Sequence, residues 1–186
     1  MEKTKRLFIA INLPIELKRE LFEMKKEINS QLGEEYAKVK VFKWVEMENL
    51  HLTLKFIGEI GDGQIPKIIE NIENIVKSQE SFEIKTEKIC YDNEKQCQLI
   101  WLTTEKSRNL ENLAKNFDEK NYSGHITLAR IKKWVFKRIE PEERPSISRD
   151  FDKKIPVKSI ELMESVLKKT GPDYKIIKSF NLPPHQ

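Results

Sequence analysis

The spacing of hydrophobic residues along the chain predicts three helices. Apolar residues recur every three or four positions in these segments, which is the period of a single helix face. The segments run from Leu17 to Leu32, from Ile65 to Val76 and from Leu110 to Phe117. Gly33 follows the first of them, where a left-handed residue often ends a helix.

Short apolar runs and alternating patterns predict strands in the rest of the chain. In the strand that begins at Leu50, Leu52, Leu54 and Phe56 alternate with His51, Thr53 and Lys55. A period of two places the first set on the core face and the second set together on the opposite face. The other expected strands are 7–11, 39–45, 82–91, 98–103, 125–129, 157–167 and 174–182, with turns at 92–95 and 170–173.

Composition narrows the class of protein. The chain has 186 residues, of which 38% are hydrophobic and 34% charged, and its net charge of +4 is a mild bias towards anionic partners. No segment has the run of about 18 apolar residues that a membrane span needs, and the charged start has no signal-peptide pattern. Cys90 and Cys97 fit neither a metal knuckle nor a redox pair, so we expect reduced thiols in a cytoplasmic protein.

A short motif occurs twice and carries the candidate chemistry. Two of the three histidines begin the same pattern, His-x-Thr-Leu, at residues 51–54 and 125–128. The second copy begins 74 residues after the first, at 125 against 51. A single recurrence at this distance indicates an internal duplication with two-fold pseudosymmetry rather than a solenoid, which needs three or more repeats. Within each copy the alternation puts His and Thr on one strand face, about 7 Å apart.

Two such strands facing each other would supply two imidazoles and two hydroxyls. Phosphodiester cleavage uses this inventory: a neutral His accepts a proton from the nucleophile, and a protonated His donates one to the leaving oxygen. An ordinary His pKa near 6.5 allows both forms near neutral pH. Hydroxyls of Thr53 and Thr127 could donate to the non-bridging phosphate oxygens. This chemistry requires no metal or other cofactor, and we expect none.

The paired motifs resemble those of the two-histidine phosphoesterase superfamily. The segments 44–58 and 124–130, the opening Arg6–Ile11 and the closing residues 164–174 look like its RNA 2′,3′-cyclic phosphodiesterase branch, the LigT/ThpR-like proteins once called 2′-5′ RNA ligases. The resemblance implies an α+β fold. Its two pseudosymmetric lobes would each be an antiparallel sheet backed by helices, flanking a central cleft. It makes residues 1–186 a single bilobal domain with one motif in each lobe.

The same resemblance implies hydrolysis of an RNA-terminal 2′,3′-cyclic phosphate to a 2′-phosphate. His51 would be the proton donor and His125 the proton acceptor, with Thr53, Thr127 and Arg130 binding the phosphate. The motifs themselves do not distinguish the acid from the base. The expected partners are RNA ends, including tRNA fragments, for a monomer without a membrane partner.

Two other functions stay open at this point. One is a related reaction, either 2′-5′ RNA ligation or hydrolysis of a cyclic nucleotide such as ADP-ribose cyclic phosphate. The other is a non-catalytic RNA-binding module that uses the same surface. No phosphate-binding loop or nucleophile elbow is present in the sequence to support ATP-dependent ligation or serine hydrolysis.

Several further residues need the structure to decide their role. Strand alternation places Lys55 beside His51 but places Arg130 on the core face with Ile126 and Leu128, against the phosphate role that the resemblance implies. The basic run from Lys132 to Arg138, with interleaved Trp134 and Phe136, could hold an RNA backbone or form a solvated loop. The tail 183–186, which contains His185, is expected to fray.

Overall fold

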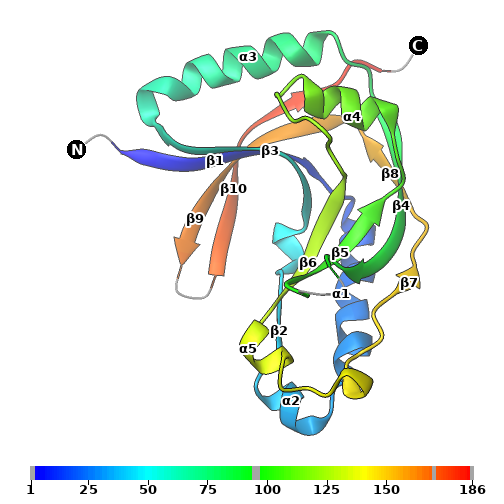
Figure 1. The fold of residues 1–186 in the computed structure, drawn as a ribbon. Coiled ribbons are helices and arrows are strands. Elements are labelled where there is room, and N and C mark those ends of the chain that lie inside the picture. Colours follow the sequence, from blue (N-terminus) through cyan, green and yellow to red (C-terminus); the bar gives the residue numbers. More distant parts are fainter. Residues whose placement is uncertain (1–2, 94–96, 169–170, 185–186) are drawn as a thin grey trace.

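Ten strands of the protein form one connected antiparallel system in a computed structural model, which describes residues 3–93, 97–168 and 171–184. The main path runs β10-β9-β1-β3-β6-β5-β4-β7, with β2 paired to β6 and β8 paired to β4 (Figure 1). The strands are β1 Thr4–Asn12, β2 Phe42–Trp44, β3 His51–Gly61, β4 Phe82–Tyr91, β5 Leu99–Thr104, β6 His125–Ile131, β7 Arg149–Asp150, β8 Lys154–Val157, β9 Ser159–Lys168 and β10 Gly171–Asn181.

The strand order divides the sheet into two halves that meet at the repeated motifs. β10, β9, β1 and β3 form the first half, and β6, β5, β4 and β7 form the second. The strands that begin with the two motif histidines, β3 and β6, are neighbours at the junction. The expected antiparallel α+β fold is therefore confirmed, and both motifs lie in the middle of the sheet.

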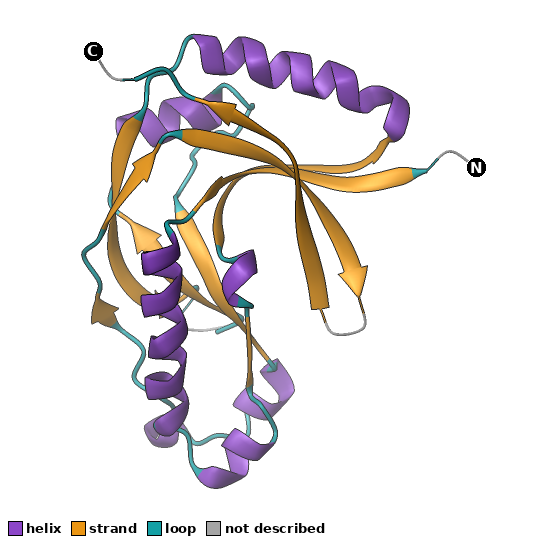
Figure 2. Cartoon of the chain, turned by 180° about the vertical axis from the view of Figure 1, so that it is seen from behind, coloured by secondary structure: helices purple, strands orange, loops and turns teal. Residues whose placement is uncertain are grey.

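Helices cover the two halves separately (Figure 2). α3 (Ile65–Lys77) lies over the first half, where it buries Ile72 and Val76 and forms an ion pair from Glu73 to Lys178 of β10. α1 (Ile15–Ser30) follows β1 in sequence but packs on the second half, with Leu17, Leu21, Met24 and Ile28 buried. Ser107 caps the start of α4 (Arg108–Lys115), and its hydroxyl oxygen accepts a hydrogen bond from the Leu110 amide. Each fully buried aliphatic side chain contributes about 1.5–3 kcal/mol, so these stripes fix the helices to the sheet.

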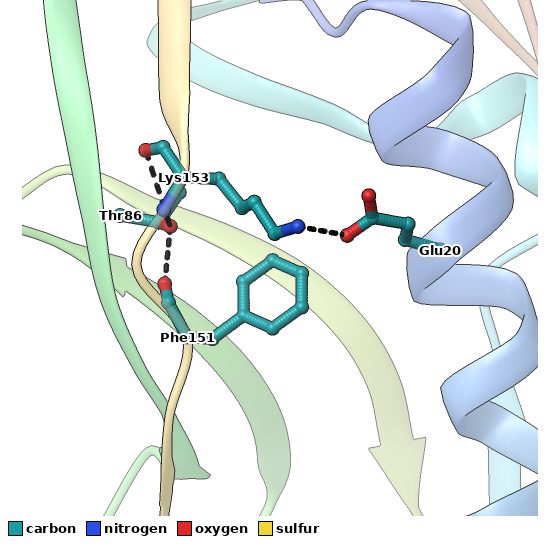
Figure 3. Close-up of polar contacts among 4 residues, drawn as sticks. All are labelled: Glu20, Thr86, Phe151 and Lys153. Atoms are coloured by element: carbon teal, nitrogen blue, oxygen red, sulfur yellow. Dashed lines mark hydrogen bonds and ion pairs between the residues drawn. The ribbon is translucent and has the colours of Figure 1, made fainter.

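A buried hydroxyl joins the segment between β7 and β8 to β4. The Thr86 side chain is fully buried, donates a hydrogen bond to the Phe151 carbonyl and accepts one from the Lys153 amide at 2.9 Å (Figure 3). The Lys153 ammonium lies 2.7 Å from the Glu20 carboxylate of α1. One threonine thus links a connecting segment to the sheet, and the adjacent lysine links that segment to a helix.

We expect Thr86→Val to lower the free energy of unfolding by about 1–3 kcal/mol, because it leaves the buried Phe151 carbonyl and the partly buried Lys153 amide without their partner while keeping the shape of the side chain. Denaturant unfolding measures this loss. Lys153→Ala, which removes the exposed ion pair with Glu20 and the cation–π contact with Phe151, is the matched variant and should cost about 1 kcal/mol or less. Equal losses in the two variants would contradict this account of Thr86.

Element boundaries differ from the sequence-based expectations in several places. Gly33 has φ −55° and precedes a second short helix, α2 (Glu34–Lys38), so the expected left-handed helix end at Gly33 is wrong. Lys40 takes the positive φ of 48° instead, and β2 covers only three of the expected strand residues. Residues 132–156, for which the sequence pattern predicted no helix or strand, contain α5 (Lys133–Phe136), β7 and the start of β8. Three-residue 3-10 turns are η1 Met47–Asn49, η2 Asp62–Gln64 and η3 Pro141–Glu143.

Parts of three expectations lie outside the described residues. These are the turns at 92–95 and 170–173 and the tail containing His185. The first tail residue, Pro183, accepts a hydrogen bond from the Ser81 amide at 2.7 Å. Both cysteines are free thiols. Within the described ranges, no helix is long and apolar enough to cross a membrane.

Candidate active site

The pairing of β3 with β6 brings the two motifs together crosswise. Leu52 pairs with Ile126 in antiparallel register. The flanking positions on the opposite face then bring His51 across from Thr127 and Thr53 across from His125. The two histidines occupy diagonal corners of this arrangement, a relationship that spaces such positions by about 7–8 Å. The sequence-predicted His and Thr residues therefore share one small surface, with an imidazole at each end.

Hydrogen bonds fix the tautomer of His51. Its Nδ1 lies 2.7 Å from the carbonyl oxygen of Asn49, which can only accept, so Nδ1 carries the proton. Nε2 lies 3.0 Å from the Thr53 hydroxyl. In the neutral ring Nε2 therefore presents its lone pair to the site and accepts from Thr53. This orientation leaves Nε2 as the atom that can exchange a proton with a substrate.

Aromatic rings enclose the His51 imidazole. The ring centroids of Phe8 and Tyr174 lie 5.0 and 5.1 Å from it, with Tyr174 edge-on. Burial lowers the pKa of His51 to about 4. The nearby Lys18 ammonium acts in the same direction, while the bond to Asn49 opposes the shift. His51 is therefore neutral in the free protein near neutral pH, which corrects the expectation that both imidazoles titrate close to neutrality.

The Asn49 side chain holds the strand that carries Tyr174. Its Nδ2 donates to the Pro172 carbonyl at 2.9 Å, and its Oδ1 accepts from the Tyr174 amide at 3.3 Å. The same residue thus orients His51 through its backbone and positions the Tyr174 ring through its amide. Burial raises the pKa of Tyr174, and the charges of Arg130 and Arg6 oppose that shift.

The second motif has a similar backbone contact but a different ring neighbour. Nδ1 of His125 donates to the Ser123 carbonyl at 3.0 Å, so Nε2 is again the atom left for a substrate. Trp101 of β5 stacks on the imidazole, with centroids 4.1 Å apart and planes 24° apart. The preceding residue, Gly124, has no room for a Cβ, which would lie 2.8 Å from a methyl group of Leu110. Close packing behind Gly124 therefore fixes the start of β6.

A β-bulge lies at the last residue of each motif, and the two bulges correct three predictions that strict alternation made. Ile9 pairs with Lys55 and Ala10 with Thr53, so Leu54 is an extra residue in β3. Lys55 consequently leaves the His51 face, where it was expected, and lies 2.9 Å from Glu119 in an ion pair. Phe56, expected in the core, pairs instead with Phe8 on the site face and is 73% exposed.

The bulge in β6 has the same effect on Arg130. Ile100 pairs with Ala129 and Trp101 with Thr127, so Leu128 is the extra residue. Leu128 and Ala129 are both buried, and Arg130 is exposed. The prediction that alternation puts Arg130 on the core face is therefore wrong. Phe56 and Arg130 hold equivalent positions, five residues after His51 and His125.

The aromatic and amide neighbours of the histidines were not predicted as site residues. Trp101, Phe8, Tyr174 and Asn49 come from distant segments, and their roles depend on strand pairing. The sequence offered one signal for the aromatic neighbours: Phe8, Trp101 and Tyr174 each lie in an expected strand. Across residues 3–93, 97–168 and 171–184, no cluster of three His, Cys, Asp or Glu side chains is arranged to hold a metal ion.

Comparison with solved structures shows the class of fold. A protein of Thermus thermophilus superposes with a TM-score of 0.78 at 24% identity, covering 97% of this chain and 100% of that one. E. coli LigT, solved with phosphate, gives a TM-score of 0.73 at 20% identity, covering 98% and 99% of the two chains. These proteins share the bilobal LigT fold with this chain.

Sequence comparison identifies the family. The model described as LigT like Phosphoesterase matches residues 11–95. A Methanocaldococcus jannaschii protein named RNA 2′,3′-cyclic phosphodiesterase is 30% identical over 94% of this chain and 99% of its own length. An Aquifex aeolicus protein of the same name is 30% identical over 75% of this chain and 81% of its own. The chain belongs to the LigT-like phosphoesterase family.

Proposed function

We propose that this protein hydrolyses the 2′,3′-cyclic phosphate at the 3′ end of RNA to a 2′-phosphate. The observation that carries the proposal is the crosswise arrangement of two His-Thr pairs on β3 and β6. An in-line displacement at phosphorus needs a proton acceptor and a proton donor on opposite sides, and diagonal imidazoles meet that need. The names of the relatives support the choice of a cyclic phosphate on RNA.

In the proposed reaction His125 acts as base and His51 as acid. Nε2 of His125 takes a proton from water as the water oxygen bonds to phosphorus. The bond from phosphorus to the ribose 3′-oxygen breaks, and Nε2 of His51 gives its proton to that oxygen. The products are a 3′-hydroxyl and a 2′-phosphate, and one proton has passed from His51 to the substrate while His125 has gained one.

His51 must acquire a proton before it can act as the acid. Burial holds its pKa near 4 in the free protein, but the negative charge of a bound phosphate favours the imidazolium. Thr53, Thr127 and Arg130 would supply the hydrogen bonds and charge that hold the non-bridging oxygens. In this proposal the substrate itself prepares the acid, and the protein's own side chains supply the catalysis without a metal ion.

The direct test uses an oligoribonucleotide that ends in a 2′,3′-cyclic phosphate, incubated with the protein in EDTA. We expect conversion to a 2′-phosphomonoester, identified by its resistance to a 3′-specific phosphatase. Loss of turnover in EDTA would contradict metal independence. If the protein does not turn over this RNA but does turn over a 2′-5′ linkage or ADP-ribose cyclic phosphate, its substrate is that compound and not the cyclic-phosphate RNA. No turnover on any of them would contradict the enzymatic function.

The pH dependence of kcat/KM should reveal the shifted histidine. The reaction needs His51 protonated and its base deprotonated at once, so kcat/KM rises with pH only up to the lower of the two free-enzyme pKa values. With the pKa of His51 at about 4, this acid limb should lie no higher than about pH 4 and not near 6.5. The acid limb of kcat should lie at higher pH, because phosphate binding favours protonated His51. Stopped assays between about pH 3.5 and 9 measure both profiles. An acid limb of kcat/KM near 6.5 would show that His51 is not buried as described.

The cellular compartment is part of the same proposal. Two free thiols and an RNA substrate are consistent with a reducing cytoplasm, where disulfides are rare. RNA ends, including tRNA fragments, would be the substrates there.

A further inference from the structure

Exposed basic residues follow the second motif, in β6 and in the segment after it. Residues 121–139 contain five Lys or Arg and no Asp or Glu, and residues 36–45 contain three Lys and no Asp or Glu. These two segments lie side by side, because β2 pairs with β6 and the Lys132 amide donates to the Val41 carbonyl at 2.9 Å. Strand pairing therefore concentrates positive charge that the sequence distributes over two distant segments.

The cations of this surface are exposed. We call it the basic strip and define it as Lys43, Arg130, Lys132, Lys133, Lys137 and Arg138, together with Trp134. Lys43 and Arg130 are direct cross-strand partners. Among the residues that the structure describes, none of these six cations forms an ion pair with an Asp or Glu. Like charges held this close are costly, which favours an anionic partner over this surface.

Trp134 adds an exposed aromatic face to the strip. It is 64% exposed, and the Arg138 guanidinium lies 5.3 Å from its ring centroid. Its neighbour Phe136 is buried against Phe42 and Tyr91, so the sequence-based suggestion that Phe136 could stack on a base is wrong. Of these two aromatic residues, only Trp134 is available to stack on a base. An exposed indole among cations is the combination by which proteins hold single-stranded nucleic acid, with bases on the ring and phosphates on the charges.

We propose that the basic strip binds the single-stranded RNA that precedes the cyclic phosphate. This inference rests on the proposed function, because an RNA ending in a cyclic phosphate at the histidine pair can continue only in its 5′ direction. Arg130 begins the strip on the site face, and β6 leads directly from His125 through Arg130 to α5 (Figure 1). From His125 to Lys132 the strand advances about 23 Å, enough to contact several nucleotides.

The strip predicts a dependence on RNA length. The test compares a nucleoside 2′,3′-cyclic phosphate with an RNA of about eight nucleotides that has the same end. For Lys43→Gln/Lys133→Gln/Lys137→Gln we expect KM for the longer RNA to rise about tenfold or more, with kcat unchanged and less than twofold effect on the mononucleotide. The slope of log KM against log salt should fall by about 2, at roughly 0.7 for each lysine removed. Trp134→Ala should raise KM for the longer RNA about fivefold or more.

The control is Lys67→Gln/Lys85→Gln/Lys158→Gln, which removes the same charge from exposed lysines outside the strip. This control variant should change KM by no more than about twofold, both for the mononucleotide and for the longer RNA. The proposal is overturned if the two triple variants behave alike, if the strip variant affects both substrates equally, or if an RNA duplex of the same length competes better than the single strand. Failure of the unmodified protein on the mononucleotide as well as the longer RNA would instead contradict the proposed function.

Discussion

His51→Ala and His125→Ala should each lower kcat on a cyclic-phosphate RNA by at least about 10²-fold, because each removes a proton transfer that has no substitute in the site. The two Nε2 atoms are the ring nitrogens that the backbone carbonyls of Asn49 and Ser123 leave available. The double variant should be little worse than either single variant, because the two groups act in one step. Steady-state rates on purified protein measure this, with thermal unfolding as the check on folding.

The choice of leaving group separates the two roles. A phosphodiester with a nitrophenol leaving group needs little proton donation, so His51→Ala should recover most of its loss on that substrate. His125→Ala should recover none, because water still needs its base. The opposite pattern would exchange the acid and base assignments. Retention of more than about a tenth of kcat by either variant would contradict a catalytic role for that histidine.

Thr53→Val and Thr127→Val should each reduce kcat/KM by about 10²–10³-fold, the loss expected when one donor to a developing negative charge is removed. Valine keeps the shape and strand preference of threonine, so the change isolates the hydroxyl. The Thr53 hydroxyl also contacts Nε2 of His51, and Thr53→Val should therefore shift the acid limb of the pH profile as well. Thr127→Val should leave that limb in place.

Thr103→Val is the matched control for this pair. Thr103 pairs with His125 on the neighbouring strand, but its hydroxyl donates to Glu87 and to the Lys88 carbonyl. Its loss should change kcat/KM by less than about threefold. A comparable loss in all three variants would show that these threonines support the sheet and do not hold the phosphate.

The repeated motif and the helix periods were readable from the sequence because they are local. His51 and His125 each begin a strand, and Thr53 and Thr127 follow on the same face, as alternation predicts over two residues. The apolar stripes of α1, α3 and α4 lie where the helical period put them, because a buried helix face needs apolar residues at that spacing. The two motifs also marked the centre of the fold.

Alternation failed beyond the motifs because a bulge changes which face a residue occupies. The extra residues Leu54 and Leu128 turn Lys55 away from the site and turn Phe56 and Arg130 towards it. A bulge is a property of two paired strands, so one strand's sequence does not reveal it. The expected role of Arg130 came from the resemblance, and the structure supplies the geometry that makes this role possible.

The sequence by itself determined the chemical groups, their duplication and the helical and strand periods, because these depend on neighbours within a few residues. Only the tertiary structure decided that β3 and β6 are adjacent in the register that sets the histidines diagonally. It also decided that Phe8 and Tyr174 enclose His51, and that Trp101 stacks on His125. The burial of His51 and the charge of Lys18 beside it come from segments far away in the chain, so the pKa of His51 is a property of the folded protein.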